Sequence, residues 1–186
     1  MWVFGYGSLI WQPGFPVAEQ VAARLPDWHR SFCMWSIHHR GTEANPGLVL
    51  ALDAAPGRAC LGLALKVAPG AEAETLAYLR ERELVSSAYL EREVELALTD
   101  GRSVRALAYV VDPGHRQYCG DLTLERQAQV ILGATGGRGP NRDYLWNTQS
   151  HLDALGLGDP DLDWLAARVR HLAAGETGGA SGLSSD

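Results

Sequence analysis

Two stretches of the chain, residues 47–53 and 60–67, are apolar at almost every position, and this continuity restricts the folds that the chain can adopt. A strand with one face in water alternates apolar and polar side chains, whereas a strand covered on both faces does not. The stretches "GLVLALD" and "CLGLALKV" have strand length and are separated by the turn-rich sequence "AAPGRA". We expect two strands that are buried on both faces or belong to the wall of a barrel.

Further strands and one helix are expected in the first two-thirds of the chain. "WVFG" predicts a strand at the N-terminus, and "QVAARL" and "RSFCMWSIHH" predict two more across the corner "PDW". Residues 71–83 are rich in Ala, Leu, Glu and Arg, which favours a helix. Residues 89–111 alternate around "DGR", with Val94, Leu96 and Leu98 on one face, and therefore predict a hairpin.

The last third predicts helices. "TLERQAQVILGAT" begins with Thr123 as a capping residue, and "PNRDYLWNTQSHLDALG" and "DPDLDWLAARVRHLAAG" each have proline early and glycine late. The predicted fold class is therefore α+β, with a small, strongly curved or barrel-like sheet, one helix inserted within it and flanking helices. We expect one domain over residues 1–174 and a disordered polar tail over residues 175–186.

Composition excludes several classes of function. The net charge of −6 argues against nucleic-acid binding, which needs a basic face. No apolar run approaches the roughly 20 residues that span a bilayer, and the N-terminus lacks the pattern of a secretory signal. Three widely spaced cysteines, Cys33, Cys60 and Cys119, fit neither a disulfide framework nor a zinc site. We expect free thiols in a reducing cytoplasm and no membrane contact, and the sequence contains no feature that indicates an oligomeric state.

The N-terminal stretch "MWVFGYGSLIW" is apolar except for two glycines that bracket Tyr6 and are followed by Ser8. Because glycine lacks a Cβ atom, Gly5 and Gly7 permit a sharp turn or the close approach of another molecule to the peptide groups. A bulge or a hairpin corner explains the same residues. The stretch alone does not separate a ligand-binding turn from a structural one.

Glu83 occupies a helical position where an apolar side chain is expected. Residues 72, 76, 79 and 83 lie on one stripe, whose two leucines make it the core-facing one. Burial and the negative end of the helix dipole both raise the pKa of a carboxyl group, which suits it to accept a proton near neutral pH. The alternatives are that the helix frays and Glu83 reaches solvent, or that Glu83 pairs with Arg80 or Arg82.

Other candidate residues also have purely structural explanations. His38 and His39 are adjacent, so on a strand they point to opposite faces and do not easily share a metal ion. Arg40 is a candidate cation for a carboxylate ligand. Tyr118 and Tyr144 are compatible with core positions and tethered hydroxyls.

Five motifs occur in an order and spacing that resemble the ChaC family of γ-glutamyl cyclotransferases, over residues 1–173. They are "VFGYGSLIW", "HHRG", "PGLVLAL", "YLREREL" and "NRDYLWN". The resemblance implies a small β-barrel with flanking helices and Glu83 as the proton acceptor, with no metal and no cofactor. It also implies that substrate is bound by Val3, Phe4, Gly5, Tyr6, Gly7, Ser8 and Leu9, largely through the backbone, and by Arg40, Tyr118 and Tyr144.

The expected activity is cleavage of glutathione to 5-oxoproline and Cys-Gly by intramolecular aminolysis. Three alternatives stay open. The same chemistry could act on other γ-glutamyl amino acids or amines, and the fold could serve as a non-catalytic module that binds γ-glutamyl groups. A metal hydrolase that uses His38, His39 and Asp53 is the third.

Overall fold

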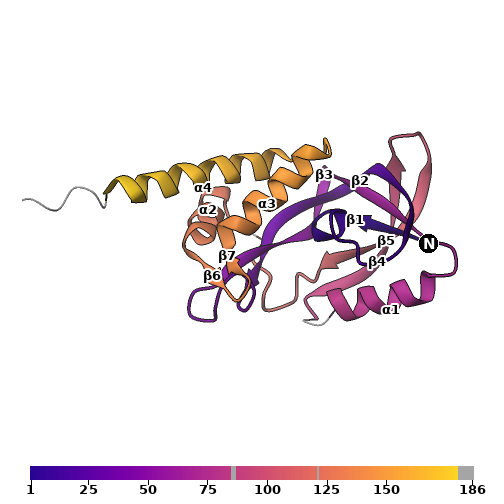
Figure 1. Ribbon diagram of the computed structural model, residues 1–186, viewed down its shortest axis with the longest axis horizontal. Helices are drawn as coiled ribbons and strands as arrows, with labels where there is room; N and C mark the ends of the chain where they lie inside the picture. The colour runs from indigo at the N-terminus through magenta and orange to yellow at the C-terminus, as the bar shows by residue number, and fades with distance from the viewer. Residues whose placement is uncertain (85–86, 121, 180–186) are drawn as a thin grey trace, which may run out of the picture. The chain divides into compact units, whose positions relative to one another are not determined.

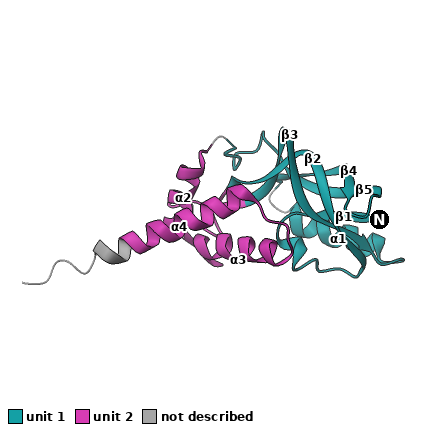
Figure 2. Ribbon diagram, turned by 90° about the horizontal axis from the view of Figure 1, so that it is seen from above, with its two compact units in different colours: residues 1–34, 50–120 teal, residues 35–49, 121–186 magenta. Residues whose placement is uncertain are grey.

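Strands dominate the first part of the chain and helices the last part (Figure 1). The structure is a computed structural model that describes residues 1–84, 87–120 and 122–179. The described residues form two compact units, one of residues 1–34 and 50–120 and one of residues 35–49 and 122–179 (Figure 2). The elements are β1 (Trp2–Gly5), η1 (Ser8–Ile10), β2 (Val17–Ser36), β3 (Gly47–Val67), α1 (Glu72–Glu83), β4 (Tyr89–Leu98), β5 (Ser103–Val111), α2 (Leu124–Gly133), β6 (Thr135–Gly136), β7 (Gly139–Pro140), α3 (Asn141–Ala154) and α4 (Pro160–Gly179).

Five strands close into a barrel in the order β1-β3-β2-β4-β5. β1 is antiparallel to β3, with Trp2 opposite Lys66, and parallel to β5, with Val3 opposite Leu107. The parallel contact between the first and last strands closes the sheet. The α+β class, the barrel and the flanking helices that the sequence predicts are confirmed.

Two strands are longer than the sequence predicts. β2 includes the "PDW" corner and β3 includes "AAPGRA", so the expectation of two separate strands on each side of a turn is wrong. Asp27 and Gly57 have positive φ values of 63° and 80°, and the Gly57 amide donates to Asp27 Oδ1 at 2.8 Å. The turn-forming residues thus produce a local irregularity in paired strands instead of a chain reversal, as β-bulges do.

Successive residues of β1 face opposite sides of the barrel wall, and both sides are covered. Phe4 packs in a cluster with Leu96 of β4 and Val110 of β5, whereas Val3 packs in a second cluster with Leu79 of α1. β3, which carries the near-continuous apolar runs, also contributes to both clusters, with Ala64 in the first and Val67 in the second, so its two faces are both covered. The second cluster also fixes α1 on the outside of the barrel.

Gly62 of β3 permits the close approach of β1. A Cβ atom at this position would lie 2.3 Å from the carbonyl oxygen of Gly5 and 2.7 Å from the ring of Phe4. Only glycine fits without a shift of the backbone. The end of β1, from which the N-terminal turn starts, is therefore pressed against β3.

β4 and β5 form the predicted hairpin, in register from Tyr89 opposite Val111 to Ala97 opposite Ser103. Leu96 is buried while Glu95 is exposed, so the predicted alternation is confirmed. α1 lies between β3 and β4 in the chain, and its bounds match the predicted helix to within one residue.

The second unit contains the three late helices. The Thr123 side chain accepts a hydrogen bond from the Arg126 amide and caps α2, as predicted. Asn141 at the start of α3 is buried, and its side chain bonds both the amide and the carbonyl of Leu48, at 2.6 and 2.8 Å. The amide side chain thereby fixes segment 35–49 of this unit to α3.

α4 continues to Gly179, so it includes the first residues of the segment that the sequence predicts as a disordered tail. The remainder of that segment, residues 180–186, lies outside the described residues. None of the described helices combines the length and apolar character needed to cross a bilayer.

Candidate active site

The chain turns sharply after β1. The Ile10 amide donates to the Gly7 carbonyl at 2.9 Å, and the Gln12 amide donates to the Ser8 carbonyl at 2.9 Å, which forms the short helix η1. Apart from Gly7 itself and its chain neighbours Tyr6 and Ser8, no heavy atom of the described residues would lie within 4 Å of a Cβ atom at Gly7. The packing of these residues therefore does not require glycine at this position, and the space beside its peptide group is available to a ligand.

The side chains of the turn mostly point away from that space. Val3, Phe4 and Leu9 are buried in the two apolar clusters. The buried Tyr6 hydroxyl donates to the carbonyl of Tyr109 at 2.9 Å. If this segment binds a ligand, it does so through its peptide groups and the Ser8 hydroxyl, which agrees with the backbone contacts that the resemblance implies.

α1 carries Glu83 at its last residue. Thr75 and Leu79 are buried on the face of α1 that packs against the barrel, and Glu83 follows on the same side with 20% of its side chain exposed. Burial raises the pKa of the Glu83 carboxyl, and the adjacent Arg82 cation opposes that effect in part. The helix persists through Glu83, so it does not fray before this residue, and both the burial and the pairing with Arg82 that the sequence left open are present.

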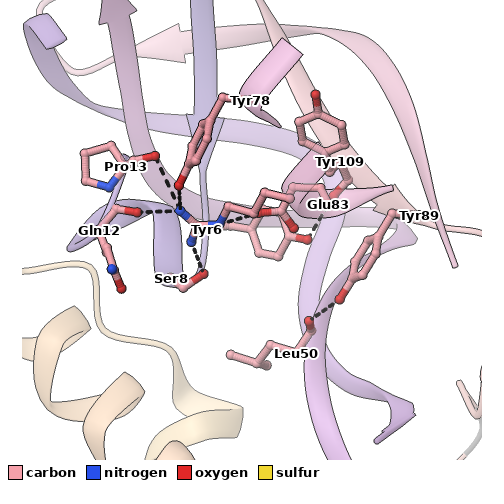
Figure 3. Close-up of polar contacts among 10 residues, drawn as sticks. Tyr6, Ser8, Gln12, Pro13, Leu50, Tyr78, Glu83, Tyr89 and Tyr109 are labelled. Atoms are coloured by element: carbon pink, nitrogen blue, oxygen red, sulfur yellow. Dashed lines mark hydrogen bonds and ion pairs between the residues drawn. The ribbon is translucent and has the colours of Figure 1, made fainter. Parts of the chain in front are cut away.

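Arg82 joins Glu83 to the N-terminal turn. Its Nε lies 3.1 Å from Glu83 Oε1, and its Nη2 donates to Ser8 Oγ at 2.9 Å. Its Nη1 donates to the carbonyl of Gln12 at 2.8 Å and to the Tyr78 hydroxyl at 2.9 Å. Figure 3 shows the partners of these bonds together with Tyr6 and Tyr109. The carboxyl and the turn therefore share one guanidinium group, although they are more than 70 residues apart in sequence.

Tyr109 of β5 borders the same region. Its hydroxyl donates to Glu91 Oε2 at 3.2 Å, and Arg80 forms a bidentate pair with that carboxylate at 2.7 and 2.8 Å. Burial raises the pKa of the Tyr109 hydroxyl, and the negative charges of Glu91 and Glu83 add to the effect. Tyr109 is therefore a neutral phenol at neutral pH. No local pattern in the sequence distinguishes Tyr109 from an ordinary core tyrosine of a β-strand.

Tyr118 lies in the same unit, and its hydroxyl donates to Asp53 Oδ2 at 2.8 Å. The chain next to it is paired with β2, since Met34 and Tyr118 form an isolated bridge and the Cys119 amide donates to the Cys33 carbonyl at 2.8 Å. Tyr118 is thus held at both its backbone and its hydroxyl, as expected for a tethered aromatic residue.

Arg40 and Tyr144 lie in the second unit and contact each other. The Arg40 guanidinium is 5.1 Å from the centre of the Tyr144 ring, and its Nη1 donates to the carbonyls of Arg138 and Pro140 at 2.6 and 3.4 Å. The two predicted substrate-binding residues thus form one cluster within this unit.

His38 and His39 also lie in the second unit, where their carbonyls accept hydrogen bonds from Gly137 and Arg138 at 2.8 and 2.9 Å. Among residues 1–84, 87–120 and 122–179, no three or more His, Cys, Asp or Glu side chains are grouped so that they could hold a metal ion. The geometry of the described residues therefore gives no support to the metal-hydrolase alternative.

The closed five-stranded barrel with its helices is the fold of the γ-glutamyl cyclotransferases. A crystal structure of a γ-glutamyl cyclotransferase specific to glutathione from yeast superimposes with a TM-score of 0.81, at 25% identity and over 92% of this chain and 96% of that one. The chain belongs to the ChaC family, because the model of the ChaC-like proteins matches residues 1–172.

Curated relatives agree with this assignment. The glutathione-specific γ-glutamylcyclotransferase of Escherichia coli is 36% identical over 94% of this chain and 74% of its own length. The human glutathione-specific γ-glutamylcyclotransferase 1 is 32% identical over 91% of this chain and 77% of its own length. The resemblance seen in the five sequence motifs is confirmed.

Proposed function

We propose that this protein cleaves glutathione to 5-oxoproline and Cys-Gly by an intramolecular aminolysis. The observation that carries the proposal is the Glu83 carboxyl, mostly buried and joined through the Arg82 guanidinium to Ser8 of the glycine-bracketed turn. The names of the bacterial and human relatives specify glutathione and support this choice of substrate.

In this reaction the α-amine of the γ-glutamyl residue attacks its own side-chain amide carbon. A bond forms between that nitrogen and the carbonyl carbon, the amide bond to cysteine breaks, and a proton from the attacking nitrogen ends on the leaving cysteine nitrogen. The α-amine is mostly protonated at neutral pH, so a base must first remove a proton. Glu83, with a pKa that burial raises, is that base, and once protonated it is the acid for the leaving amine.

Ring closure also needs the amine and the carbonyl carbon to be held at roughly 3–3.5 Å. The peptide N–H groups around Gly7 bind the substrate α-carboxylate and fix this geometry, because consecutive amides form a positively polarised concavity. The absence of any described atom beyond the chain neighbours within 4 Å of a Cβ at Gly7 supports this role. The side chains that pack the turn into the barrel make it rigid.

Arg40, Tyr118 and Tyr144 are proposed as further substrate contacts on the basis of the family resemblance. The hydroxyl of Tyr118 is bound to Asp53, so Tyr118→Phe tests a substrate contact by its effect on KM with glutathione. An unchanged KM removes Tyr118 from the proposed site.

The activity is tested by incubating the purified protein with reduced glutathione and measuring both 5-oxoproline and Cys-Gly. Glu83→Gln is expected to lower kcat by at least about 10²-fold while the fold is retained, since it keeps the shape and removes the base. Glu81→Gln, which changes an exposed carboxyl group of the same helix, is the matched control and should keep wild-type activity.

Two results would contradict the proposal. Near wild-type formation of 5-oxoproline by Glu83→Gln would remove Glu83 as the base. Turnover of other γ-glutamyl amino acids or amines in preference to glutathione, measured in parallel, would replace the substrate while leaving the chemistry in place.

A further inference from the structure

The guanidinium of Arg82 contacts more protein atoms than a simple ion pair with Glu83 would involve. Besides Glu83 Oε1 and Ser8 Oγ, it contacts the carbonyl oxygens of Gln12 and Pro13, at 2.8 and 3.4 Å, and the Tyr78 hydroxyl at 2.9 Å. These partners come from the N-terminal turn and from α1 itself. Arg82 therefore lies at the junction of the two elements that carry the proposed site.

The contacts of Arg82 argue for a structural role over substrate binding. Nη1 contacts the oxygens of Gln12, Pro13 and Tyr78, Nη2 donates to Ser8 Oγ, and Nε lies 3.1 Å from Glu83 Oε1, so all three nitrogens contact the protein. A substrate carboxylate that bound this group through two nitrogens would have to compete with these contacts. The side chain is suited instead to hold the turn and the helix end in one relative position.

A second observation shows that the same junction is tightly packed. Gly14 follows the turn with a φ of 77°, and a Cβ atom there would lie 2.1 Å from the Tyr78 hydroxyl oxygen. That oxygen is one of the acceptors of Arg82 Nη1. The chain at Gly14, the ring of Tyr78 and the guanidinium of Arg82 thus leave little freedom for the turn to move against α1.

The electrostatic consequence falls on Glu83. Burial disfavours the charged form of the Glu83 carboxyl and so raises its pKa. Among the described residues, Arg82 carries the only charge that lowers this pKa. Arg80 is on the same helix but directs its guanidinium to Glu91. The two arginines carry the same chemical group but pair with different carboxylates, Arg80 with Glu91 and Arg82 with Glu83.

We propose that Arg82 is the positioning residue of this site. It holds the N-terminal turn, through Ser8, Gln12 and Pro13, against the end of α1, and it keeps the Glu83 carboxyl in one orientation. The inference rests on the proposed function, since it assigns these two elements to one reaction. Arg82 acts through Glu83 and the turn and does not touch the reacting atoms.

Three variants test this role: Arg82→Gln, Arg82→Lys and the control Arg80→Gln. The first readout is titration of the Glu83 carboxyl carbon by NMR in ¹³C-labelled protein, which needs no substrate. The second is the pH profile of kcat/KM with glutathione, whose acid limb reports the base in the free enzyme. Melting temperature and the amide NMR spectrum confirm that each variant is folded.

Arg82→Gln removes the charge and the fork, that is, the planar, branched set of N–H donors of the guanidinium. The Glu83 titration and the acid limb should therefore both move to higher pH. kcat/KM should fall about 10²-fold, the scale of a misplacement near 1 Å. Arg82→Lys restores the charge without the fork, so the titration should stay near that of the wild type while kcat/KM remains low. Arg80→Gln should change neither readout.

The proposal is overturned by a folded Arg82→Gln whose Glu83 titration is unshifted, or by one whose kcat/KM is within about twofold of the wild type. If Arg82→Gln does not fold, Arg82→Lys decides, because wild-type kcat/KM would show that the fork is not needed. If the wild-type protein does not convert glutathione, the proposed function fails, and the NMR titration alone decides whether Arg82 holds Glu83.

Discussion

The Tyr6 hydroxyl donates a buried hydrogen bond to the backbone carbonyl of Tyr109, a residue 103 positions later in the chain. This bond ties the start of the N-terminal turn to the last strand of the barrel. It also holds the Tyr6 side chain in the core, so that Tyr6 offers only its peptide groups to a ligand at the turn.

Tyr6→Phe removes this bond and leaves the Tyr109 carbonyl without the donor. We expect the free energy of unfolding to fall by about 1 kcal/mol, the net worth of a typical buried hydrogen bond. Chemical denaturation measures the change, and the KM for glutathione should rise because the turn loses one of its fixed points. A variant as stable as the wild type would show that the bond contributes nothing to the fold.

The acid limb of activity should lie above the ordinary range of a glutamate. Burial raises the pKa of Glu83 above 4.5, and a base must be deprotonated to accept a proton, so kcat/KM should decline as the pH falls through that raised pKa. Steady-state kinetics between about pH 4 and pH 8 measure the limb. A profile that stays flat down to 4.5 would contradict the raised pKa.

The same raised pKa makes a prediction about stability. Glu83 has a pKa of 4.5 in the unfolded chain and a higher pKa in the folded protein, so between these two values the folded protein binds more protons. The contribution of this group to stability is therefore present below pH 4.5 and is lost as the pH rises through the folded pKa. Glu83→Gln should therefore be more stable than the wild type at neutral pH, and this gain should vanish at about pH 4.

Thermal unfolding of both proteins at the two pH values measures the difference. Glu81→Gln on the same helix is the control, since its exposed carboxyl group should change the free energy of unfolding by no more than about 0.5 kcal/mol at either pH. A loss of stability in Glu83→Gln at neutral pH would mean that the pairing with Arg82 outweighs the burial of the charge.

Gly7 and Gly62 should respond differently to alanine. Gly7→Ala meets no described atom beyond its chain neighbours within 4 Å, so the fold should be retained while the KM for glutathione rises steeply or turnover is lost. Gly62→Ala would place a Cβ atom 2.3 Å from the Gly5 carbonyl oxygen and should destabilise the protein by about 1–3 kcal/mol. A fully active Gly7→Ala variant would reject substrate binding by the backbone of the turn.

The sequence predicts well those features that depend on local periodicity. The alternation in β4 gives the buried face of Leu96, and the stripe on α1 marks Glu83 as an acid on the core-facing side. The two long strands were divided wrongly, because Asp27 and Gly57 are turn-forming residues whose backbone angles serve equally well in a bulge.

Features that depend on contacts between distant segments had no signal in the sequence. Arg82 was one of two arginines beside Glu83, and nothing in "YLREREL" separates it from Arg80. The packing of α1 on the barrel decides that Arg82 binds Ser8 and that Arg80 binds Glu91. The same holds for Tyr109, which the closure of the barrel places beside the turn.

The parallel pairing of β1 with β5 has a consequence for protein synthesis. The glycine turn leaves the ribosome before the strand that closes the barrel, which ends only at Val111. A nascent chain that ends soon after Glu83 still lacks Leu107, the β5 partner of Val3, and the Tyr109 carbonyl that accepts the hydrogen bond from the Tyr6 hydroxyl. The proposed degradative activity is therefore withheld until synthesis has passed the end of β5.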